Sequence, residues 1–166
     1  TRDEHKQKED ENKFDFSIFY PSELATIGGN YGGEGVQYYQ DDYPNVPYGK
    51  GTISTSGCGP TCFAMVASQI TGQKITPVDA IKWCGNKYYV WDIGTSWDYF
   101  QAAADHFNLG VKVTQTKDIN SAVSALRNGK LVISSQAKGL FTASNHFILL
   151  YKVDKDEKIY VKDPNK

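Results

Sequence analysis

The stretch SGCGPTCFAMVA, at residues 56–67, predicts a tight glycine turn that leads directly into a buried helix. Pro60 suits the first position of a helix, because its missing N–H would have no partner there and its fixed φ already fits. The residues that follow, as far as Ile70, are apolar on nearly every side. We therefore expect a helix that runs through the core, with Cys58 at its start.

Cys58 is the candidate nucleophile of this turn. A thiol at the start of a helix meets unpaired N–H groups and the positive end of the helix dipole, and both favour the thiolate. The flanking glycines, Gly57 and Gly59, are expected to leave room for another backbone to approach the sulfur. Cysteine is also among the most frequently buried residue types, so a packing role is the alternative.

Composition excludes several classes of function. The 166 residues suffice for one domain with a core, and the net charge of -1 offers no attraction to nucleic acid or to an anionic membrane. No apolar run is long enough for a membrane span. The three cysteines (Cys58, Cys62 and Cys84) are an odd number without the spacing of a zinc site. We expect no disulfide framework, no metal and no organic cofactor.

The N-terminal part differs in composition from the rest. Residues 1–13 are almost wholly charged and polar, which predicts a linker or a solvated helix, and residues 27–33 form a glycine-rich joint. The apolar residues 14–24 between them could dock on the domain. The resulting division is a linker segment at 1–35 and one domain at 36–166. The chain begins at Thr1 rather than Met, as a processed or trimmed chain would.

Helices are expected before strands along the domain. Thr76 and Pro77 open a second helix with Asp79 completing a capping box, and Thr95 is expected to cap a third helix. A short helix follows near residue 118. Alternating or apolar runs predict strands, at residues 111–115, 131–135, 146–153 and 159–163. This order predicts an α+β fold in which N-terminal helices pack on a C-terminal antiparallel sheet.

The last two strands bring a histidine and a carboxylate together. His146 opens one strand and Asp163 ends the next, so antiparallel pairing carries both to the same end of the sheet. A turn closing near residues 154–156 would place His146 opposite residue 162 or 163. A carboxylate there can orient the imidazole, which can take the proton of the thiol. His106, at the expected end of a helix, is interpreted as structural.

Attack of a thiolate on an amide also requires donors for the developing oxyanion. The backbone N–H of Cys58 can supply one. Gln37 and Gln40 are the upstream candidates for the second, and residue spacing does not choose between them.

The chain resembles bacterial papain-like cysteine peptidases related to the double-glycine leader (bacteriocin-processing) peptidases, the cysteine peptidase family thirty-nine-like domains. The resemblance extends from about residue 36 to the end. It rests on QDDY (40–43), VPYGKGTI (46–53), SGCGPT (56–61), ITP (75–77), GTSW (94–97), SNHFI (144–148) and DPN (163–165).

This resemblance implies a papain-like fold with a site formed by Cys58, His146, Asp163 and Gln40. It implies a cysteine peptidase that acts on a peptide or protein substrate without a cofactor, and export to the surface or exterior of a Gram-positive bacterium. Trp97 and Asn145 could border the cleft. The alternatives are a non-catalytic peptide or cell-surface binding module on the same fold, or a cell-wall peptide hydrolase or acyltransferase.

Overall fold

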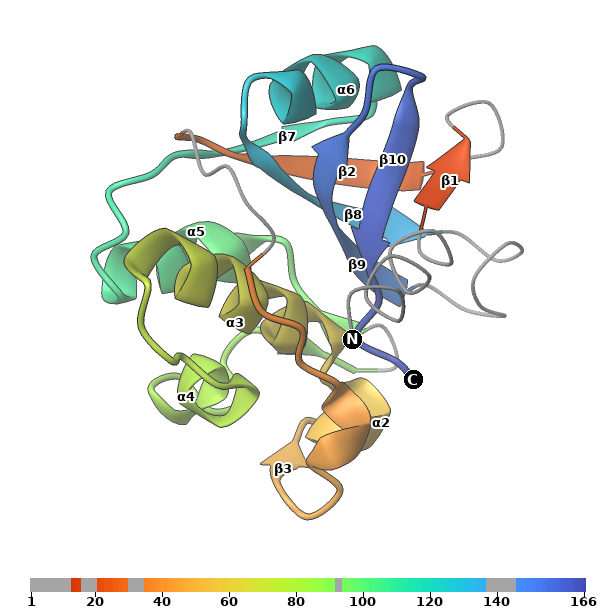
Figure 1. The fold of residues 1–166 in the computed structure, drawn as a ribbon. Helices are drawn as coiled ribbons and strands as arrows, with labels where there is room; N and C mark the ends of the chain where they lie inside the picture. The colour runs from red at the N-terminus through yellow and green to blue at the C-terminus, as the bar shows by residue number, and fades with distance from the viewer. Residues whose placement is uncertain (1–12, 16–20, 30–34, 92–93, 137–145) are drawn as a thin grey trace.

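The computed structural model describes residues 13–15, 21–29, 35–91, 94–136 and 146–166 (Figure 1). A six-stranded antiparallel sheet has the helix α6 (Ile119–Arg127) on one face and a layer of helices on the other. Its strands follow the order β1 (Lys13–Asp15), β10 (Lys158–Lys162), β9 (His146–Val153), β8 (Leu131–Gln136), β2 (Pro21–Ile27) and β7 (Val113–Thr116). The helices of the other layer are α2 (Ile53–Ser56), α3 (Cys58–Thr71), α4 (Pro77–Lys82) and α5 (Asp98–His106). This is the α+β arrangement that the order of the elements predicted.

The two faces of the sheet bury alternate side chains. On β8, Leu131 and Ile133 belong to the core shared with α3 and α5, whereas Val132 belongs to the core under α6 (Ile119–Arg127). On β9, Leu149 and Leu150 divide in the same way. Successive side chains of a strand point to opposite faces, so near-continuous apolar strands are required where both faces are covered.

β2 corrects the interpretation of residues 1–35 as a linker. This strand pairs antiparallel with β8 on one side and with β7 on the other, so it is an internal strand of the sheet. Leu24, Ala25 and Ile27 have exposures of 0%, 0% and 1%. Residues 21–27 of the N-terminal segment thus form part of the sheet and its core, while residues 1–12, with His5, 16–20 and 30–34 lie outside the described residues.

α3 runs through the centre of the molecule, as predicted, and every residue from Gly59 to Ser68 is buried. The helix begins at Cys58, two residues earlier than Pro60 indicated. Pro60 still fits, because the N–H groups of the whole first turn lack acceptors within the helix. Cys58 is therefore the first residue of the helix rather than the last residue of the turn before it.

Helix caps follow the sequence in one case and not in another. At α4, the Asp79 N–H donates to Thr76 Oγ1 and the Thr76 N–H donates to Asp79 Oδ2, which confirms the capping box. Thr95 does not cap α5. It lies in β6 (Gly94–Thr95), which pairs with β5 (Tyr89–Val90), and the residue that precedes α5 is Trp97.

Candidate active site

His146 and Asp163 meet at the end of the sheet nearest the start of α3. His146 is the first residue of β9 and Asp163 follows the last residue of β10. His146 Nε2 lies 2.8 Å from Asp163 Oδ1, with the imidazole 6% and the carboxylate 30% exposed. The structure therefore brings together the histidine and the aspartate that the hairpin predicted. Because Nε2 bonds Asp163, Nδ1 is the ring nitrogen that remains for another partner.

The register of the hairpin differs from the predicted one. Ile159 pairs with Val153, but an irregularity after Tyr160 moves the register, so that Lys162 pairs with Leu149. Continuing that register would place residue 165, not 162 or 163, opposite His146. Asp163 consequently reaches the imidazole diagonally from beyond the end of β10.

Asn165 is a residue of this site whose role was not predicted from the sequence. Its backbone N–H donates to Asp163 Oδ1 at 2.8 Å, and its Nδ2 lies 3.5 Å from His146 Nε2. Asp163 Oδ1 therefore faces both the imidazole and a backbone donor. The signal for Asn165 would have been the hairpin register, which the irregularity in β10 concealed.

His146 also interacts with Cys58. Burial lowers the pKa of His146, but hydrogen bonds with Asp163 and Cys58 and the charges of both groups raise it, and the net result is a pKa of about 9. An imidazole with this pKa holds its proton at neutral pH. The positively charged imidazole therefore lies beside the Cys58 sulfur.

The glycines that flank Cys58 have a different purpose from the one expected. A Cβ on Gly57 would lie 2.7 Å from the Ile53 carbonyl oxygen, and a Cβ on Gly59 would lie 2.8 Å from the Thr95 side chain. The space beside the glycines is occupied by α2 and β6 rather than left open for a substrate backbone. Tight packing on both sides fixes the position of the Cys58 main chain.

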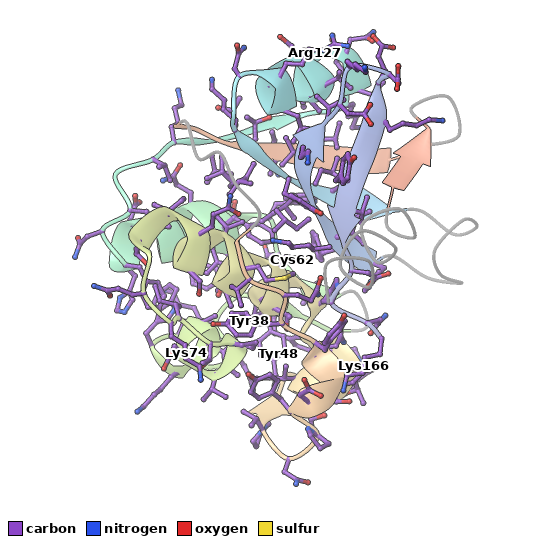
Figure 2. All side chains as sticks on the ribbon, in the orientation of Figure 1. Tyr38, Tyr48, Cys62, Lys74, Arg127 and Lys166 are labelled. Atoms are coloured by element: carbon purple, nitrogen blue, oxygen red, sulfur yellow. The ribbon has the colours of Figure 1, made fainter. Side chains whose placement is uncertain are left out.

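The other two thiols differ from Cys58 in their surroundings. Cys62, one turn further along α3, is fully buried in the core shared with the sheet (Figure 2), and burial raises the pKa of its thiol well above the usual value. Burial also raises the pKa of Cys84. Cys58 is half-buried and is the thiol that interacts with His146.

The two candidate glutamines have separate partners. Gln40, at the start of the 3-10 helix η2 (Gln40–Asp42), is 4% exposed, and its Nε2 donates to the carbonyl oxygens of Ser54, at 2.9 Å, and Ile53, at 3.3 Å. Among the described residues its Oε1 has no hydrogen-bond partner. Gln37 Nε2 donates to the carbonyl oxygens of Tyr38 and Asp163. In this structure both amide protons of each glutamine are therefore directed at backbone carbonyls.

Two further residues were expected to border the cleft. Trp97 packs against Phe147 and Phe100, with ring centroids 5.0 Å and 5.5 Å away, and belongs to the edge of the main core. Asn145 lies outside the described residues. His106, as predicted, ends α5, where its ring stacks on Trp83 at 4.5 Å.

In the described ranges, no three His, Cys, Asp or Glu side chains are grouped as metal ligands would be. Nor does that part of the chain contain a helix with the length and apolar character needed to cross a membrane.

Comparison with known proteins identifies the class. The model of the Peptidase_C39 like family matches residues 36–166, which include the α3 turn, the His146–Asp163 pair and most of the sheet. The chain belongs to this family, and its fold is the papain-like α+β fold. No curated protein and no solved structure matches the chain.

Proposed function

We propose that the protein is a cysteine peptidase that hydrolyses peptide bonds through Cys58, His146 and Asp163. The observation that carries the proposal is the position of the His146 imidazole, which hydrogen-bonds Asp163 through Nε2 and interacts with Cys58. In such an arrangement the imidazole activates the sulfur nucleophile and the carboxylate orients the imidazole. Membership of a peptidase family supports a peptide or protein as the substrate.

The reaction assigns one role to each side chain. The Cys58 thiolate attacks the carbonyl carbon of the scissile bond, and the His146 imidazolium then donates its proton to the departing amine. Water next attacks the thioester carbon while His146 accepts a proton from it, which releases the carboxylic acid product and returns the proton and the thiolate to their starting places. Asp163 holds the imidazole in orientation through both steps.

Oxyanion stabilisation falls first to the backbone N–H of Cys58, at the start of α3, where N–H groups have no acceptor within the helix. Gln40 is the proposed second donor. Because its Nε2 donates to Ile53 and Ser54, this role requires the amide to exchange at least one of these carbonyls for the oxyanion. The buried Oε1, which has no hydrogen-bond partner in the part of the chain that the structure describes, makes the present orientation of the amide a costly one, and this cost favours such a rearrangement.

The experiment compares the protein with its Cys58→Ala variant on a library of peptides, with products read by mass spectrometry. Cleavage should be lost in Cys58→Ala and kept in Cys84→Ala, which removes a half-buried thiol outside the site. Equal cleavage by Cys58→Ala would overturn the proposal. Binding of peptides without cleavage would instead indicate a binding module, and incorporation of a labelled amine would indicate acyl transfer.

Alkylation tests the nucleophile without any knowledge of the substrate. At neutral pH iodoacetamide should modify Cys58 before Cys62 and Cys84, because burial raises the pKa of both other thiols. Peptide mapping of the partly alkylated protein gives the order. Modification of Cys84 ahead of Cys58 would contradict an activated Cys58.

A further inference from the structure

The segment that carries Asp163 lies outside the sheet and needs other support. β10 ends at Lys162, the last residue with a β9 partner, so the Asp163 backbone has no place in the ladder. The sheet therefore does not determine where the Asp163 carboxylate points.

Gln37 binds the main chain of Asp163 from a distant part of the sequence. Gln37 Nε2 donates to the Asp163 carbonyl oxygen at 2.9 Å, across 126 positions of sequence. The second proton of the same amide goes to the Tyr38 carbonyl oxygen at 2.8 Å, which limits the rotation of the amide. Gln37 is half-buried, so water competes less for these bonds than it would at an exposed site.

Two later residues of the segment, Pro164 and Lys166, are held as well. Pro164 is buried, its ring fixes its own φ, and its carbonyl oxygen accepts the Gln40 backbone N–H at 2.8 Å. Beyond it, Lys166 forms an ion pair with Asp42. Gln40 and Asp42 thus hold the residues that follow Asp163, whereas Gln37 binds the main chain of Asp163 itself.

We infer that Gln37 is a positioning residue of the catalytic site, which fixes the Asp163 backbone and so directs the Asp163 carboxylate at His146. This assignment gives Gln37 a role other than that of oxyanion donor, and it rests on the proposed function for its catalytic meaning. Within the described ranges, the groups that face the imidazole are Asp163 and Asn165 from the C-terminal segment and Cys58 from α3. Gln37 acts on the imidazole only through the first of these.

The decisive variants are Gln37→Met, which has a similar length but no donor, and Gln37→Ser, which is too short to reach the carbonyl. Gln101→Met is the matched control, because the Gln101 side chain also donates to a backbone carbonyl outside its own helix, that of Val111, away from the site. Folding of each variant is checked by thermal unfolding.

Two measurements need no substrate. NMR titration gives the pKa of His146, and the rate of iodoacetamide reaction gives the reactivity of Cys58 as a function of pH. We expect both Gln37 variants to lower the pKa of His146 by about one unit and to slow alkylation by roughly tenfold at pH 7, while Gln101→Met changes neither.

An unchanged pKa of His146 and an unchanged alkylation profile in folded Gln37 variants would overturn the inference. Failure of both Gln37 variants to fold, with Gln101→Met folded, would also overturn it, because Gln37 would then be a structural residue. Failure of the proposed function is distinguishable: a wild-type protein that cleaves no peptide but whose imidazole responds to Gln37 would reject the peptidase activity alone.

Discussion

His146 Nε2 bonds Asp163 Oδ1 at 2.8 Å, although the two residues belong to different strands and lie 17 positions apart. The consequence is chemical as well as structural, because an imidazole bonded through Nε2 has only Nδ1 with which to exchange a proton. Once the imidazolium has given up its Nδ1 proton, the neutral ring keeps the Nε2 proton that Asp163 accepts, and Nδ1 is then the nitrogen that can take a proton from water.

Asp163→Asn tests this relationship, because it keeps the acceptor oxygen but removes the charge. We expect the pKa of His146 to fall from about 9, since the hydrogen bond and the charge of Asp163 both raise it. Peptide hydrolysis should drop by about 100-fold or more. NMR titration and kcat measure the two effects. Asp156→Asn, on the exposed turn between β9 and β10, is the control and should change neither.

Gly59→Ala tests the packing beside the nucleophile. The new Cβ would lie 2.8 Å from Thr95, whose Oγ1 lies 2.7 Å from the hydroxyl of the buried Tyr48 and so has little freedom to move. We expect a loss of stability of about 1–3 kcal/mol and a slower alkylation of Cys58, measured by denaturant unfolding and by iodoacetamide.

Two companion variants separate the causes in that experiment. Gly59→Ala combined with Thr95→Gly should recover part of the alkylation rate, because the second change removes the side chain that the new methyl meets. Gly72→Ala, at the far end of α3, should lower stability through its positive φ of 70° and leave Cys58 alkylation unchanged. Equal effects of Gly59→Ala and Gly72→Ala on alkylation would contradict the specific role of Gly59.

The parts of the site that could be predicted from sequence are those set by local signals. Gly57–Pro60 marks a helix start whichever residue begins the helix, and the Asp154–Glu157 turn forces residues 146–153 and 158–162 to pair. These two features bring the sulfur-bearing helix and the His146–Asp163 end of the sheet into the prediction.

The parts that could not be predicted depend on distant contacts. The irregularity after Tyr160 is not encoded by any glycine or proline there, and it changes which residue faces His146. The direction of the Gln40 amide is set by the carbonyls of α2, which no spacing rule foresees. Threonine is a residue type that often caps helices, but Thr95 lies in the strand β6, where its side chain packs against Gly59.

Stability should depend on pH through His146. Its pKa is raised from 6.5 to about 9 in the folded state, so folding favours the protonated form. This contribution is fully present below pH 6.5 and is lost as the pH rises through about 9, and the free energy of unfolding should fall across that window. The pKa shift corresponds to a loss of about 3 kcal/mol in the free energy of unfolding. This figure is an upper value, because Cys58 is coupled to the same proton.

Urea unfolding at pH 6, 7, 8 and 9 measures this slope, and His146→Gln should flatten it. In Cys58→Ala the window should narrow, because one hydrogen bond and one charge that raise the pKa are removed. A free energy of unfolding that stays constant from pH 6.5 to 9 in the wild-type protein would contradict the raised pKa.

β2 provides the sharpest test of the domain boundary. The family match begins at residue 36, but β2 at Pro21–Ile27 separates β8 from β7, and β7 has no other partner strand in the described sheet. A chain that begins at residue 36 would therefore leave β7 unpaired, expose one edge of β8, and remove the buried side chains of Leu24 and Ile27 from both cores. We expect this chain to lose cooperative unfolding.

A chain that begins at residue 21 loses only the edge strand β1 and should keep cooperative unfolding. Ala25→Asp in the full chain, which buries an unpaired charge at a position with 0% exposure, should cost more than about 3 kcal/mol. Thermal and urea unfolding of the three proteins decide the point, and a chain of residues 36–166 that unfolds cooperatively at the temperature of the full chain would show that β2 is dispensable.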